Sequence, residues 1–92
     1  MKIASTPVAL VAKTLIQSAT QREINAMRPG VIVANRKDGT LGRCANSTWG
    51  ISVCYRTKNG VHGQTIGDYP HFVAQHWRIA TDEEVRRYFD GD

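Results

Sequence analysis

Acidic residues are scarce over most of this chain. Residues 1–80 hold three Asp and Glu against ten Lys and Arg, a net charge of +7. Residues 81–92 hold five acids against two basic residues, a net charge of −3. The body is therefore basic and the C-terminal segment acidic. This distribution favours a body that faces phosphate groups or an acidic protein surface.

Long apolar runs are also missing. No stretch reaches about 18 consecutive apolar residues, so the sequence predicts no membrane span. The apolar run at residues 8–12 follows Lys2, but it is interrupted at Lys13 and lacks a good cleavage site at residues 18–20. These features argue against a secretory signal. We therefore expect a cytoplasmic protein.

Cysteine is scarce, and its spacing does not fit a zinc site. Cys44 and Cys54 are the two cysteines, and neither has the short-range partner that structural zinc sites use. In a cytoplasmic protein we expect two reduced thiols. A hairpin that turns near Trp49 would place the cysteines on facing strands, so a redox-sensitive disulfide stays an alternative.

The three histidines add no metal-binding pattern. His71 and His76 are five residues apart, so they would not share a face of a helix. His62 lies in a different predicted element. We expect no metal site, no cofactor and no catalytic residue.

The length of 92 residues indicates a single domain. We divide it into a helical N-terminal segment (1–28), a β-rich core (29–81) and a C-terminal helix (82–90). In the first segment, apolar residues recur at helical spacing, although the β-branched content of residues 8–16 leaves a strand as an alternative. Thr20 and Glu23 then form a capping box that predicts a second short helix.

Glycine-rich turns separate five short apolar segments in the core. The predicted strands lie at residues 31–33, 40–45, 51–56, 61–67 and 77–80. Asn59-Gly60 is typical of a type I′ hairpin turn. We expect an α+β fold: a small, strongly bent, five-stranded antiparallel sheet or a small barrel, with N-terminal helices and a short C-terminal helix.

The C-terminal helix begins at a second capping box, formed by Thr81 and Glu84. Val85, Tyr88 and Phe89 would form its apolar face, with the neighbouring arginines on the other side. We expect this face to pack on the sheet, and a protruding, partner-binding helix is the alternative.

Three segments of the core carry recognisable local patterns. In residues 27–33, Pro-Gly precedes the first strand, and residues 38–44 read D-G-x-x-G-x-C. Residues 77–81 would form a closing strand that runs into the terminal helix. In this order the three segments resemble the SH3-like small β-barrels. The resemblance covers about residues 28–82 and implies a barrel fold. It lacks the acidic loop and paired aromatics of the members that bind proline-rich peptides, and a fold alone does not imply a function.

The candidate binding residues are basic side chains on two turns and a strand, with one aromatic residue. They are Arg36, Lys37, Arg43, Arg56, Lys58 and Trp49. A closed sheet could gather the cations on one surface that contacts phosphates, while the aromatic ring could stack on bases. Tyr55 belongs to the alternating apolar set and is expected in the core. The leading hypothesis is a small non-catalytic module that binds an anionic partner. The favoured partner is nucleic acid or a nucleic-acid-associated machine.

Two other function classes stay open. The first is a regulator or inhibitor that acts by stoichiometric binding to a protein, a type that phages and mobile elements often encode. The second, ranked last, is a small Cys/His enzyme, since a cysteine nucleophile needs a nearby base and an accessible, electropositive setting.

Overall fold

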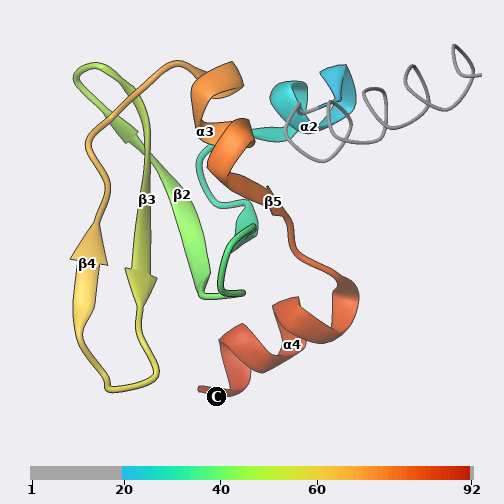
Figure 1. Ribbon diagram of the computed structural model, residues 1–92, viewed down its shortest axis with the longest axis vertical. Coiled ribbons are helices and arrows are strands. Elements are labelled where there is room, and N and C mark those ends of the chain that lie inside the picture. The colour runs from blue at the N-terminus through green and yellow to red at the C-terminus, as the bar shows by residue number, and fades with distance from the viewer. Residues whose placement is uncertain (1–19, 92) are drawn as a thin grey trace, which may run out of the picture.

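A computed structural model describes residues 20–91, and an open, five-stranded antiparallel sheet lies at its centre (Figure 1). The strand order is β4-β3-β2-β1-β5. The strands are β1 (Ile32–Asn35), β2 (Leu41–Ser47), β3 (Gly50–Arg56), β4 (His62–Gln64) and β5 (Trp77–Ile79). The helices are α2 (Gln21–Ala26), α3 (Pro70–His76) and α4 (Asp82–Asp90).

The predicted α+β class and the five antiparallel strands are confirmed. The sheet has two edges, β4 and β5, and α3 connects them. The second predicted N-terminal helix is α2. The first one, together with the choice between helix and strand at residues 8–16, lies outside the described residues.

One face of the sheet, the inner face, carries the hydrophobic core. Val33, Cys44 and Val53 point to this face from β1, β2 and β3 and are at most 1% exposed. Trp77 and residues of α3 complete the same cluster. Each fully buried aliphatic side chain of this kind contributes roughly 1.5–3 kcal/mol relative to exposure.

The opposite face of the sheet, the outer face, is partly covered by α4. Ile32 and Ala34 alternate with Val33, so they point to this face, and both are buried. They lie on β1, and α4 contacts β1 and β2. The expected packing of the C-terminal helix on the sheet is therefore observed, although Phe89 is 66% exposed rather than packed.

Both predicted capping boxes are present. In the first, the Glu23 amide donates to Thr20 Oγ1 (3.1 Å) and the Thr20 amide donates to Glu23 Oε1 (3.2 Å). In the second, the Glu84 amide donates to Thr81 Oγ1 (3.2 Å) and the Thr81 amide donates to Glu84 Oε1 (2.9 Å). These contacts fix where α2 and α4 begin.

The turn between β3 and β4 differs from the expected type. Gly60 has a φ of 80°, but no non-glycine residue in the described part of the chain has a positive φ. A type I′ turn needs a positive φ at Asn59 as well, so that prediction was wrong. The Gly60 amide donates to the Thr57 carbonyl (2.9 Å). This hydrogen bond, with Gly60 left-handed, matches the three-residue hairpin loop built on a type I turn.

The two cysteines lie on adjacent strands but on opposite faces. Cys44 is the register partner of Val53, and Arg43 is that of Cys54. Because side chains alternate along a strand, this one-residue offset turns Cys44 into the core and Cys54 outward. Both are free thiols, and Cys54 is exposed.

Candidate functional site

A groove of about 1100 Å³ lies between α4 and the β3–β4 hairpin on the outer face of the sheet. Three cations line it, Arg56 and Lys58 from the hairpin and Arg87 from α4. The hairpin also contributes His62 to the lining, and α4 contributes Tyr88. We call this hollow the basic groove.

Two carboxylates also line the basic groove, and both are already engaged. Glu84 accepts two hydrogen bonds from the Arg78 guanidinium (2.7 and 2.9 Å), and these bonds lower the pKa of Glu84 to about 2. Asp38 accepts a hydrogen bond from the Thr40 amide (2.9 Å), which lowers the pKa of Asp38. Within residues 20–91, neither Arg56 nor Lys58 forms an ion pair, whereas Arg87 lies 3.8 Å from a Glu84 oxygen.

Four of the six predicted binding residues lie at one end of the sheet, and one of them, Arg36, directs its side chain to α2 and α3. Arg56 and Lys58 line the basic groove, and exposed Lys37 is followed by Asp38, which also lines it. These residues meet because the β1–β2 and β3–β4 turns close the same end of an antiparallel sheet (Figure 1). We call this end, with the groove and these turns, the basic end.

Sequence reasoning missed the contribution of α4 to the groove. Arg87 was expected on the side of α4 away from Tyr88, yet both residues line the same hollow. Glu84, Arg87, Tyr88 and Gly91 recur at helical spacing and share one face. That spacing was visible in the sequence, but nothing in it showed which face the hairpin would meet.

Arg36 makes internal contacts and does not line the basic groove. Its guanidinium donates to Glu23 Oε2 (2.7 Å) and to the Ala74 carbonyl (2.9 Å). Burial alone would raise the pKa of Glu23, but hydrogen bonds from Thr20 together with the Arg36 charge lower it. Arg36 therefore ties α2 and α3 to the first turn of the sheet.

Arg43 and Trp49 lie away from the basic groove. Arg43 is exposed on β2, with its guanidinium beside Gly30 near the start of β1. Trp49 is 76% exposed, as expected, but it lies in the β2–β3 turn at the opposite end of the sheet. Tyr55, expected in the core, packs against Trp77 with ring centroids 5.9 Å apart.

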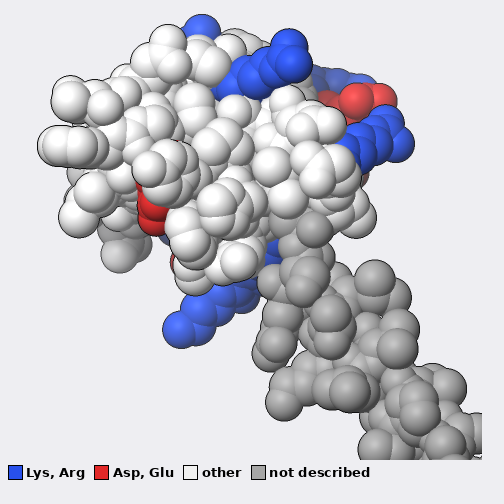
Figure 2. Space-filling view, turned by 90° about the horizontal axis from the view of Figure 1, so that it is seen from above, with Lys and Arg blue, Asp and Glu red and all other residues white. Residues whose placement is uncertain are grey.

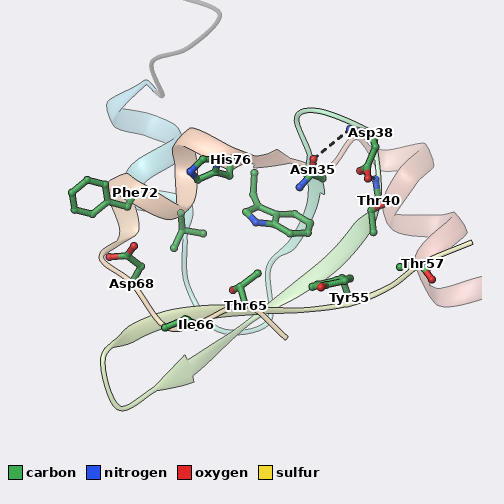
Figure 3. A pocket seen from close by; sticks show the side chains of 12 residues that line it. Asn35, Asp38, Thr40, Tyr55, Thr57, Thr65, Ile66, Asp68, Phe72 and His76 are labelled. Atoms are coloured by element: carbon green, nitrogen blue, oxygen red, sulfur yellow. Dashed lines mark hydrogen bonds between the residues drawn. The ribbon is translucent and has the colours of Figure 1, made fainter. Parts of the chain in front are cut away.

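A second hollow, the inner cleft, opens on the other face of the sheet. It measures about 540 Å³ and lies between α3 and the β3–β4 side of the sheet. Figure 3 shows Phe72 and His76 on one side, Tyr55, Thr65 and Ile66 on the other, and Asp38 with Thr40 at one end. Asp38 and Asp68 supply its charged groups, and no Lys or Arg of residues 20–91 lines it. The inner cleft is therefore unsuited to an anion.

Exposed apolar side chains gather at the end opposite the basic groove, which we call the aromatic end. They are Trp49 (76% exposed), Ile66 (88%), Tyr69 (64%) and Phe72 (42%). The segment before α3 crosses the β2–β3 turn here, because Ile51 and Asp68 exchange backbone hydrogen bonds (2.8 and 3.0 Å). Viewed from this end, the surface is mostly uncharged, with Lys and Arg near its margins (Figure 2).

The cysteines and histidines are the candidate residues for the Cys/His enzyme alternative and for metal binding. Burial raises the pKa of the Cys44 thiol to about 11, which makes it a poor nucleophile. Cys54 and His62 are diagonal neighbours on the outer face, but no hydrogen bond joins them. No three His, Cys, Asp or Glu gather as metal ligands among residues 20–91.

The three helices that the structure describes are too short to cross a lipid bilayer. Comparisons with protein-family models, with curated proteins and with solved structures each found no match for this chain.

Proposed function

We propose that this protein is a small, non-catalytic module that binds nucleic acid through the basic groove. The observation that carries the proposal is the convergence of Arg56, Lys58 and Arg87 on one hollow from two separate elements. Cations on phosphates release condensed counterions, which supplies affinity that does not depend on sequence. The carboxylates of the groove hold internal partners, so they oppose an incoming phosphate less than free carboxylates would.

The arrangement of the strands supports the proposed relation to SH3-like barrels. Five short antiparallel strands form a meander in which the last strand returns beside the first. A cytoplasmic location is part of the same proposal, supported by two free thiols that point to opposite faces of the sheet.

The test is the salt dependence of binding to a labelled oligonucleotide. Affinity measured between about 50 and 200 mM salt should fall linearly on a double-logarithmic plot. The double variant R56Q/K58Q should weaken binding, and it should reduce the slope by about 0.7–0.9 for each phosphate that is no longer neutralised. The matched control is R22Q/R28Q, which removes two exposed cations outside the groove.

Two results would contradict the proposal. One is no binding at about 50 mM salt, where electrostatic association is strongest. The other is an equal loss of affinity in R56Q/K58Q and in R22Q/R28Q, because it would show a diffuse charge effect without a site.

A second function, stoichiometric binding to a regulated protein, is favoured by the aromatic end. Exposed aromatic clusters are common at protein interfaces, where Trp and Tyr often dominate the binding energy. Under this alternative, the same protein should be captured at constant stoichiometry from a nuclease-treated lysate. Its capture should survive R56Q/K58Q and be lost in W49S/Y69S. Capture that instead depends on nucleic acid would remove this alternative.

A further inference from the structure

The basic groove is a concave site, and its shape bears on the form of nucleic acid that fits it. One wall is a face of α4, the other is the β3–β4 hairpin, and Thr40 and Leu41 of the β1–β2 hairpin also line it. A duplex is a convex rod, and proteins read it by placing a protruding helix or ribbon in a groove of the DNA. The cations of this groove line a hollow, which admits a flexible strand more readily than a rod.

The helix beside the groove is poorly suited to enter a DNA groove. Its first turn carries Asp82, Glu83 and Glu84, and it ends at Asp90. Glu84 is paired with Arg78, but Asp82, Glu83 and Asp90 form no ion pair within residues 20–91. Despite Arg86 and Arg87, these three carboxylates at the two ends of the helix would be repelled by the phosphates that border a major groove. α4 therefore serves as a wall of the site and not as a recognition helix.

The groove also contains an aromatic ring next to its cations. Tyr88 lines the hollow and directly follows Arg87. Its neighbour Phe89 meets the Tyr88 ring edge-on, with centroids 5.3 Å apart, but does not line the groove. Cations beside an aromatic surface are the combination with which proteins hold unpaired nucleotides, whose bases stack on the ring.

We propose that the basic groove binds single-stranded nucleic acid, with a base stacked on Tyr88 and phosphates on Arg56, Lys58 and Arg87. This inference rests on the proposed function, and it adds the strandedness of the ligand and the role of Tyr88. DNA and RNA single strands share the chemistry that the groove recognises.

The experiment compares four probes by fluorescence anisotropy at one salt concentration. They are a labelled oligodeoxyuridylate, the matching oligouridylate, and a mixed-sequence DNA strand both alone and annealed to its complement. We expect the lone strand to bind at least about tenfold more tightly than its duplex, since stacking on an aromatic ring requires an unpaired base. The two homopolymers distinguish DNA from RNA.

Variants of Tyr88 test the stacking role. Y88L should weaken single-strand binding roughly 5- to 150-fold, whereas Y88F should retain it. The matched control F89L removes the neighbouring ring outside the groove and should bind like the wild type. All variants should keep the salt slope of the wild type, because no cation is removed, and their circular dichroism spectra confirm that they are folded.

Failure of this inference and failure of the proposed function give different results. Duplex binding as tight as single-strand binding, or unchanged affinity in Y88L, would overturn the single-strand assignment and leave a nucleic-acid module. No binding of any probe at about 50 mM salt would overturn the proposed function itself, and this inference with it.

Discussion

The two hollows of this protein lie on opposite faces of the same hairpin and have opposite charge character. Arg56 and His62 are register partners that point outward and line the basic groove. Tyr55 and Gly63 form the adjacent pair, from which the Tyr55 ring points inward toward the inner cleft. The alternation of side chains along two short strands therefore turns the cations of the hairpin away from a cleft whose described lining holds no Lys or Arg. The two hollows still share part of their lining near the basic end, namely Asp38, Thr40, Tyr55 and Thr57.

This comparison shows why net charge is a poor guide to the site. The chain carries a net charge of +4, but two of its arginines, Arg36 and Arg78, are used in ion pairs with the capping-box glutamates. The cations available to a partner are those that the turns of the sheet and one face of α4 bring to the basic end. Variants that change one region of the protein and leave the others intact test this difference between structural and available cations.

The largest expected effect is on the aromatic end. Gly50 has a φ of 125°, and a Cβ at this position would collide with the backbone carbonyl of Asp68. Gly50→Ala should therefore destabilise the protein by about 3 kcal/mol, because neither the strain nor the clash can relax locally. Urea unfolding followed by tryptophan fluorescence measures the loss.

Gly39→Ala is the matched control, since Gly39 also has a positive φ (78°) but a Cβ there would meet no atom within 4 Å. It should cost only about 1 kcal/mol, the strain of the turn alone. Equal losses in the two variants would contradict the close packing of the segment before α3 on the β2–β3 turn.

The next largest effect is the loss of stability expected in Arg36 variants, which distinguishes Arg36 from the arginines that line the basic groove. Arg36→Ala should destabilise the protein by about 1–2 kcal/mol, because it removes two charge-assisted hydrogen bonds that join α2 and α3. Arg36→Lys should restore only part of this, since an ammonium cannot reproduce the two-partner geometry of the guanidinium. Neither variant should change oligonucleotide affinity. A loss of affinity in folded Arg36→Lys would place Arg36 in the binding site.

The smallest effect is the pH dependence that Glu84 contributes. Its pKa falls from 4.5 to about 2 in the folded protein, so its stabilisation is complete above about pH 4.5. It is lost as the pH falls through about 2. Because the Arg78 side chain is 36% exposed, solvent reduces the contribution to about 1 kcal/mol.

Glu84→Gln should remove this part of the acid sensitivity, as measured by thermal unfolding between about pH 2 and 6. The same acid-induced loss of stability in Glu84→Gln and in the wild type would assign the effect to other carboxylates.

Local patterns predicted much of the fold. The capping boxes at Thr20 and Thr81 placed the starts of α2 and α4, and the alternation of Ile51, Val53 and Tyr55 placed β3. Each of these signals depends on residues a few positions apart in the chain. For the same reason, the sequence alone located the strand segments.

The lining of the basic groove was predicted only in part, because it depends on contacts between distant residues. Arg36 pairs with Glu23, 13 residues away, and with the Ala74 carbonyl, 38 residues away. Trp49 and Lys58 are close in sequence, yet β3 runs between them and places them at opposite ends of the sheet. Arg87 joined the groove because α4 folds back on the sheet, which its own sequence does not specify.

The central claim is that an anionic polymer binds at the basic groove and not at the aromatic end. The most direct measurement is the affinity of a single-stranded oligonucleotide for R56Q/K58Q and for W49S/F72S, at about 50 mM salt. We predict a loss of at least about tenfold in the first variant and wild-type affinity in the second. Wild-type affinity in R56Q/K58Q with a loss in W49S/F72S would contradict the claim and move the binding surface to the aromatic end.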